Sequence, residues 1–110
     1  MTIRSFLELT DVLSPNAVDP TVRMRWLCEI EGRVRVELLG ENPSTLPVID
    51  LDTSEDTELA APPPYDRLYW LHHLAMCNCL AGNVARYENT AALFNETYAG
   101  FGRWLKRRDA

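Results

Sequence analysis

The sequence predicts a mainly α-helical fold, a small bundle of about four helices with an irregular middle segment whose pattern is compatible with a short β-hairpin. Apolar residues recur at spacings of three and four in several segments, which is the period of one face of a helix. Residues that typically begin or end helices separate these segments. The chain has 110 residues, the usual size of one domain. We therefore expect residues 1–110 to form a single helical domain.

The first helix is predicted at residues 3–12. Thr2 or Ser5 can cap its N-terminus, because a hydroxyl oxygen can accept a hydrogen bond from a free backbone N–H of the first turn. Ile3 begins an apolar stripe along this segment. The sequence Ser-Pro-Asn at residues 14–16 then ends the helix, since proline disfavours helix before it and asparagine suits turns.

The second helix is predicted at residues 20–39. Asp19 is suited to the N-cap and Pro20 to the first helical position, where its missing N–H has no cost. Gly40 is suited to the C-terminal cap, and Gly32 inside the helix indicates close approach of another helix. The apolar stripe consists of Trp26, Leu27, Ile30, Val34 and Leu38. The opposite face carries charges of alternating sign at i,i+4, which predict a solvent-exposed face: Arg25, Glu29, Arg33 and Glu37.

The middle segment, residues 41–64, has a different composition. Residues 47–51 alternate apolar and polar side chains, residues 52–56 form an acidic turn, and residues 58–61 are compatible with a returning strand. An isolated hairpin is marginal in water, so it would have to pack on the helices or on a neighbour. Three consecutive prolines at 62–64 end the segment.

The third and fourth helices are predicted at residues 65–81 and 84–106, joined by a tight break at 82–83 that makes them antiparallel neighbours. From Leu68 to Gly82 there is no charged residue. A helix on the outside of a globule has one charged face, so this helix should be covered nearly all round. A domain of this size has few elements for that purpose, which favours burial by another subunit. The last helix carries the stripe Val84, Tyr87, Ala91, Phe94, Tyr98, Phe101 and Leu105.

The overall charge and the cysteines exclude several classes of protein. The net charge is −5, which disfavours binding to a phosphate backbone, and the one basic cluster is Lys106, Arg107 and Arg108 at the C-terminal end. No stretch approaches the roughly 20 apolar residues of a membrane span, and the first residues lack the apolar core of a signal peptide. The three cysteines are most simply reduced thiols.

The strongest candidate for chemistry is the group His72, His73, Cys77 and Cys79. On a helix His73 and Cys77 share a face and could bind zinc, but Cys79 points elsewhere and no second ligand pair completes a tetrahedral site. Nucleophilic catalysis by Cys77 and His73 with Asp66 would lack an oxyanion donor. The simpler interpretation is that these side chains are packed in a core or an interface.

The remaining charged groups give weaker signals. The acidic turn lacks the ligand spacing and central glycine of a calcium loop, and Glu29 and Glu31 are predicted to be solvated. The arginines of the second helix are interleaved with acidic residues, which disfavours DNA reading. We expect no catalytic residue, no cofactor and no bound metal. The residues predicted to contact a partner are Tyr69, Trp70, His73, Met76, Cys77 and Trp104.

Several short segments in a fixed order also resemble a known family. They are Leu13-Ser14-Pro15-Asn16, Arg25-Trp26-Leu27, Glu31-Gly32-Arg33-Val34, Glu58-Leu59, the run from Pro62 to Tyr69, Gly82-Asn83, Tyr87 with Asn89, Leu93-Phe94-Asn95, Tyr98 and Trp104-Leu105. This combination covers nearly the whole chain and resembles the head–tail connector proteins, also called adaptor or head-completion proteins, of tailed bacteriophages and prophages. The residues from His72 to Cys79 depart from it, because other members are more polar there.

The resemblance implies a structural role without catalysis. Such adaptors form a homo-oligomeric ring on the portal protein of a capsid, and a tail or stopper protein docks beneath the ring. DNA passes through as cargo and is not read, and no membrane is involved. The expected location is the host cytoplasm during assembly and the head–tail junction of the virion afterwards. Two other hypotheses stay open from the residues alone: a small metal- or ligand-binding regulator centred on His73 and Cys77, and a DNA-binding regulator.

Overall fold

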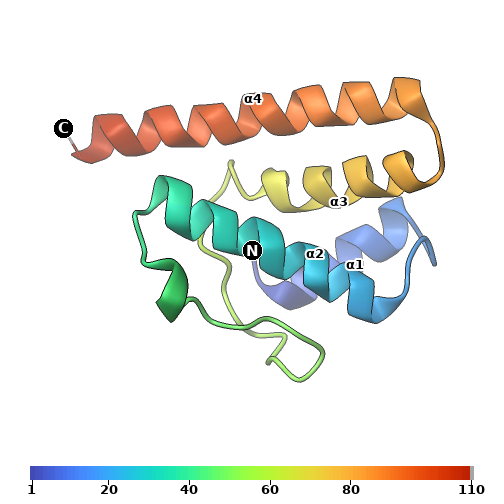
Figure 1. The fold of residues 1–110 in the computed structure, drawn as a ribbon, viewed down its shortest axis with the longest axis horizontal. Helices are drawn as coiled ribbons and strands as arrows, with labels where there is room; N and C mark the ends of the chain where they lie inside the picture. The colour runs from blue at the N-terminus through green and yellow to red at the C-terminus, as the bar shows by residue number, and fades with distance from the viewer. Residues whose placement is uncertain (110) are drawn as a thin grey trace.

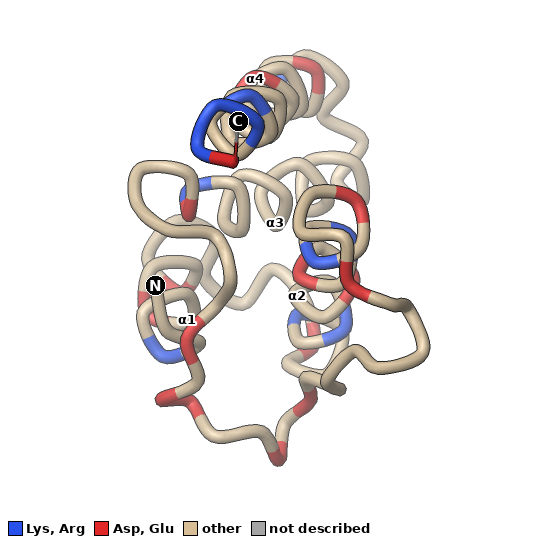
Figure 2. The backbone as a smooth tube through the Cα atoms, turned by 90° about the vertical axis from the view of Figure 1, so that its left-hand side faces the viewer, with Lys and Arg blue, Asp and Glu red and all other residues tan. Residues whose placement is uncertain are grey.

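Four α-helices form three layers, with α3 in the middle layer between α4 on one side and α1 and α2 on the other (Figures 1 and 2). The computed structural model of the chain describes residues 1–109. The predicted helical class is therefore confirmed. The bounds are Ile3–Leu13 for α1, Pro20–Arg33 for α2, Arg67–Leu80 for α3 and Val84–Asp109 for α4, with a π-helical turn η1 at Val34–Leu38 and a 3-10 turn η2 at Pro43–Thr45.

The first two helices begin at the predicted caps. The Thr2 hydroxyl accepts a hydrogen bond from the Ser5 backbone N–H at 3.1 Å. The Asp19 carboxylate accepts one from the Thr21 backbone N–H at 2.8 Å, and Pro20 occupies the first position of α2. Each cap supplies a partner for an N–H that has none inside the helix, which fixes where the helix starts.

The predicted second helix changes its winding before it ends. From Val34 onward the turn widens, and the Leu39 N–H donates to the Val34 carbonyl at 3.2 Å, five residues back. Gly40 follows with φ of +72°, a left-handed conformation that ends the segment where the glycine predicted it. Gly32 was predicted to lie close to another helix, but its neighbour is a loop residue. A Cβ at Gly32 would lie 3.4 Å from Leu46, which belongs to the loop and not to another helix.

The β-hairpin prediction for residues 41–64 is wrong. All of these residues are described, and they contain no pair of strands. The second half of the segment instead runs beside the start of α1, where the N–H of Ile3 donates to the Thr57 carbonyl at 3.0 Å and that of Arg4 donates to the Glu55 carbonyl at 2.9 Å. These contacts satisfy the free N–H groups of the first turn of α1, so the start of α1 takes the place that the first strand, residues 47–51, was expected to have beside this segment.

Helix α3, which carries no charged residue after Arg67, is covered mainly by the chain itself. Leu68, Tyr69, Leu71, His73 and Ala75 are buried, and Figure 1 shows α4 lying along one side of α3 while α1 and α2 lie on the other. A central helix has no face left for charged side chains. The absence of charge from Leu68 onward therefore reflects the central position of α3 and does not by itself require a second subunit.

Glu31 was predicted to be solvated, but its carboxylate lies in the core. Glu31 is 2% exposed, and its two oxygens accept hydrogen bonds from the Tyr69 hydroxyl at 2.6 Å and the Ala60 N–H at 2.9 Å. The Tyr69 oxygen in turn accepts from the Ala61 N–H at 2.8 Å, and Arg35 lies 3.5 Å from Glu31. A buried charge needs such partners. The network connects α2, α3 and the segment before the proline run.

Candidate functional site

The structure brings together only part of the predicted histidine and cysteine group. His73 Nε2 lies 3.5 Å from Cys77 Sγ, one helical turn further along α3. Cys79 is exposed and points away from this pair, while Cys28 and Cys77 are half-buried. Within residues 1–109, no group of three or more His, Cys, Asp or Glu side chains is placed to hold a metal ion. The predicted pairing of His73 with Cys77 is thus present as a contact between two side chains.

His73 is packed as an apolar ring. It is 2% exposed, and its imidazole contacts the Phe6 ring edge-on at a centroid distance of 5.9 Å and the Trp26 ring at 5.7 Å. Burial is the largest cause that lowers the pKa of His73 to about 4, and the positive charge of Arg23 acts in the same direction. Burial also raises the pKa of the Cys77 thiol. At neutral pH the pair is therefore an uncharged imidazole beside a thiol, which suits packing better than nucleophilic attack.

The acid that would complete a catalytic triad is elsewhere. Asp66 lies just before α3, with its carboxylate 3.6 Å from the α-amino group of Met1. It precedes His73 by seven residues, which places it about 10 Å away along the helix. Asp66, His73 and Cys77 therefore do not form a triad in this conformation.

Three of the four arginines of the second predicted helix are engaged by acidic neighbours, while Arg25 is exposed and forms no ion pair within residues 1–109. Arg23 pairs with a carboxylate of α1 at 2.5 Å, and Arg35 with Glu41 at 3.1 Å. Arg33 donates to Glu37 at 2.8 Å and lies over the Tyr98 ring, 4.6 Å from its centroid. The predicted i,i+4 pairing is confirmed for these two residues. Arginines held in this way present little free positive charge for a phosphate backbone.

The six residues predicted to contact a partner have different positions in the protein. Tyr69 is fully buried and His73 nearly so, and both are occupied by contacts inside the chain. The other four are half-buried and keep part of their surface accessible: Trp70, Met76, Cys77 and Trp104. Whether these four contact a partner stays a prediction.

A different set of exposed apolar side chains lies near one end of the molecule. We call it the apolar end and define it as Val12, Leu13, Leu80, Val84 and Tyr87. Their exposed fractions range from 39% for Tyr87 to 78% for Val12. Figure 1 shows why they gather: α1 ends, α3 ends and α4 begins at the same end of the bundle.

The apolar end includes the first two members of the predicted α4 stripe. The predicted stripe of α4 is buried at Phe94, Phe101 and Leu105, but its first two members, Val84 and Tyr87, are exposed at the end of the bundle where α3 ends and α4 begins. A hollow of about 90 Å³ lies beside them, next to Cys79.

The comparisons with known proteins give no relative: no family model, curated protein or solved structure matches the chain. Among residues 1–109, no helix is both long enough and apolar enough to cross a membrane.

Proposed function

We propose that the protein is a structural adaptor of phage head–tail assembly, which binds a portal-like protein as part of a ring and offers a docking surface to a tail or stopper protein. Two things support this proposal: the resemblance of the sequence to connector proteins along nearly its whole length, and the mainly helical fold that the resemblance implies. In this role the protein acts by packing against other subunits and catalyses no reaction.

The single observation that carries the proposal is the apolar end. Five large apolar side chains from three helices remain exposed at one end of the bundle, although Phe94, Phe101 and Leu105 of the α4 stripe are buried. Full burial of an aliphatic side chain contributes about 1.5–3 kcal/mol, so covering several of them supplies a substantial part of a binding free energy. Concentrated apolar surface at one end of a small protein is typical of a protein–protein contact.

The proposal predicts that the apolar end is required for binding to the portal. Leu80→Asp combined with Val84→Asp places two charges on this surface, and we expect binding to the portal to weaken at least tenfold, because the charges would have to be desolvated. Electron microscopy of the protein mixed with its portal shows whether rings form, and a pull-down titration gives the change in affinity.

The matched control is Leu93→Asp, which changes a 48% exposed leucine of the same helix α4 outside the apolar end. We expect this variant to bind as the wild type does. Circular dichroism should be the same for all variants, since each altered side chain is exposed. Failure of the wild type to bind the portal, or equal binding by the Leu80 and Val84 variant, would contradict the proposal.

A further inference from the structure

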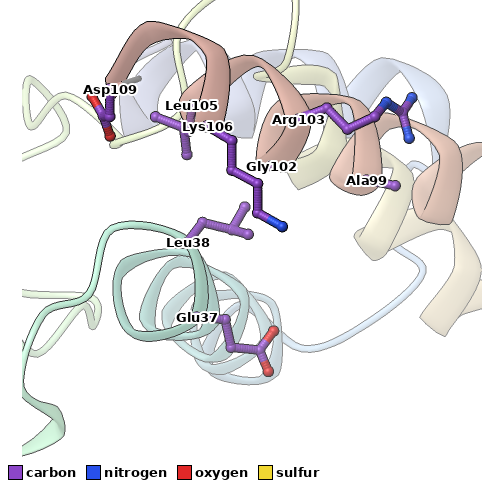
Figure 3. Close-up of a pocket in the computed structure, with 8 residues that line it drawn as sticks. All are labelled: Glu37, Leu38, Ala99, Gly102, Arg103, Leu105, Lys106 and Asp109. Carbon is purple, nitrogen blue, oxygen red and sulfur yellow. The ribbon is translucent and has the colours of Figure 1, made fainter.

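A groove lies between the C-terminal part of α4 and the end of η1, on the side of the molecule away from the apolar end (Figure 3). It encloses about 590 Å³ and has an apolar floor, which includes Leu38 and Leu105. Gly102 lies between them, and a Cβ there would come within 3.4 Å of Leu38. Arg103 and Lys106 stand on the rim, with Lys106 directed across the opening.

The free charge of this groove is positive. Among the described residues, neither Arg103 nor Lys106 forms an ion pair. The two acids that also line the groove are already engaged: Glu37 accepts from Arg33 and from the Tyr98 hydroxyl, and Asp109 pairs with Arg108 at 3.0 Å. The hydrogen bond with Tyr98 and the one with Arg33 lower the pKa of Glu37, so it stays ionised and bound to these partners. The groove therefore suits an aliphatic segment that carries negative charge.

The chain itself contains such a segment at residues 48–52, Val-Ile-Asp-Leu-Asp. Val48 and Leu51 are 74% and 61% exposed, while Ile49 between them is buried and anchors the segment to the core. Asp50 and Asp52 are exposed beside the two aliphatic side chains. Two exposed aliphatic residues with two carboxylates are complementary to an apolar floor with a basic rim.

The segment is held in one conformation in advance. The Thr53 hydroxyl accepts from the Asp50 N–H at 3.0 Å, and the Asp50 carboxylate accepts from the Asp52 N–H at 2.9 Å. Binding an ordered segment costs less conformational entropy than binding a flexible one. This rigidity favours the segment as a ligand for a groove.

The groove and the segment belong to opposite sides of the molecule. Figure 2 shows α4 with its basic C-terminal turns at the top and the acidic loop at the bottom. One copy therefore cannot fill its own groove. We propose that residues 48–52 of one copy bind the groove of a second copy, head to tail. A contact between two different surfaces of the same chain repeats, and it produces a ring if the rotation closes and a filament if it does not.

This contact rests on the ring of the proposed function, but it uses surfaces other than the apolar end and only copies of this chain, so it is tested separately from binding to the portal. Two aliphatic anchors cover far less than the roughly 800 Å² per partner of a standard interface, so we expect a dissociation constant on the order of 0.1–1 mM. The contact should weaken as salt rises, since the four charges are exposed and screened.

The test uses sedimentation velocity of the whole protein up to about 1 mM, a concentration near the expected dissociation constant. A loop variant carries Val48→Ser and Leu51→Ser, and a groove variant carries Arg103→Glu and Lys106→Glu. We expect the wild type to form species larger than a dimer and each variant to stay monomeric. An equimolar mixture of the two variants should form a one-to-one dimer and nothing larger, because only one intact loop–groove contact remains.

The matched control combines Arg86→Glu with Leu93→Ser, which changes one exposed cation and one exposed leucine elsewhere on α4. It should associate as the wild type does. A monomeric wild type at the highest concentration, association of either variant alone, or a mixture that does not form the dimer would overturn the proposal. Loss of portal binding with intact self-association counts only against the adaptor proposal, and the reverse result counts only against the head-to-tail contact.

Discussion

The local sequence around a charged residue of this protein does not reveal whether its side chain is exposed or buried. Glu29 and Glu31 are two residues apart on α2, and both read as surface acids. One is exposed, while the other accepts hydrogen bonds from Tyr69 and Ala60 inside the core. The partners of Glu31 lie 29 and 38 residues away along the chain, so no local pattern could have distinguished the two carboxylates.

This difference predicts different costs for the same substitution. Glu31→Ala leaves the Tyr69 hydroxyl and the Ala60 N–H without their acceptor in the core, and we expect the free energy of unfolding to fall by about 3 kcal/mol. Glu29→Ala on the same helix should change it by less than about 0.5 kcal/mol. Urea unfolding at neutral pH measures both, and equal losses would show that the buried network contributes little.

His73 predicts how stability depends on pH. Its pKa is about 4 in the folded protein, chiefly because it is buried, against about 6.5 in an unfolded chain. The unfolded state thus binds the proton more readily, so the stability is fully present above about pH 6.5 and is lost as the pH falls toward 4. From His73 alone we expect a loss of about 2 kcal/mol between pH 7 and pH 4.5.

The measurement is urea unfolding of the wild type and of His73→Leu across this pH range. The variant should lose less stability on acidification than the wild type does. It should still lose some, because burial and the charge of Arg33 lower the pKa of His72 to about 4 as well. Identical pH profiles for the two proteins would contradict the assignment to His73.

At the scale of elements, the sequence located all four helices because their boundaries are local. Thr2, Asp19 and Gly40 act within a few residues of where they stand, and each one is at the boundary it predicted. The incorrect predictions concerned contacts between segments that are distant in the sequence. The alternation in residues 47–51 resembles a strand, but its partner is absent, and the following segment binds the start of α1. Likewise, the lack of charge from Leu68 onward indicates that α3 is covered, but nothing within α3 indicates that three helices of the same chain cover it.

Replacing a glycine by alanine should have opposite effects on the free energy of unfolding at the end of a helix and in the middle of one. Gly82 has φ of +72°, so Gly82→Ala should lower the free energy of unfolding by about 1 kcal/mol, although the space around it is open. Gly100 lies inside α4, and a Cβ there would be 3.7 Å from Tyr65, an ordinary contact distance. Gly100→Ala should therefore raise the free energy by roughly 0.5–1 kcal/mol. Thermal unfolding of the two variants checks both signs.

At the scale of the whole molecule, charge and apolar surface are separated more sharply than the composition indicates. The chain has a net charge of −5. The segment opposite α4, residues 41–64, nevertheless carries acidic residues and no Lys or Arg, and four basic residues lie in the last two turns of α4 (Figure 2). The sequence predicted that DNA is not held tightly, and the structure adds a distribution of charge that suits contacts between copies. This distribution depends on the packing of distant segments, so only the structure could reveal it.

Helix α4 has a consequence for the geometry of any assembly that this protein forms. It is one uninterrupted helix of 26 residues, with Val84 and Tyr87 at its first turns and Arg103 and Lys106 near its last. At about 1.5 Å per residue it is roughly 39 Å long. Because no hinge interrupts it, the helix fixes the separation between a partner bound at one end and a neighbouring copy bound at the other. The spacing of such an assembly would then be set by the length of one helix.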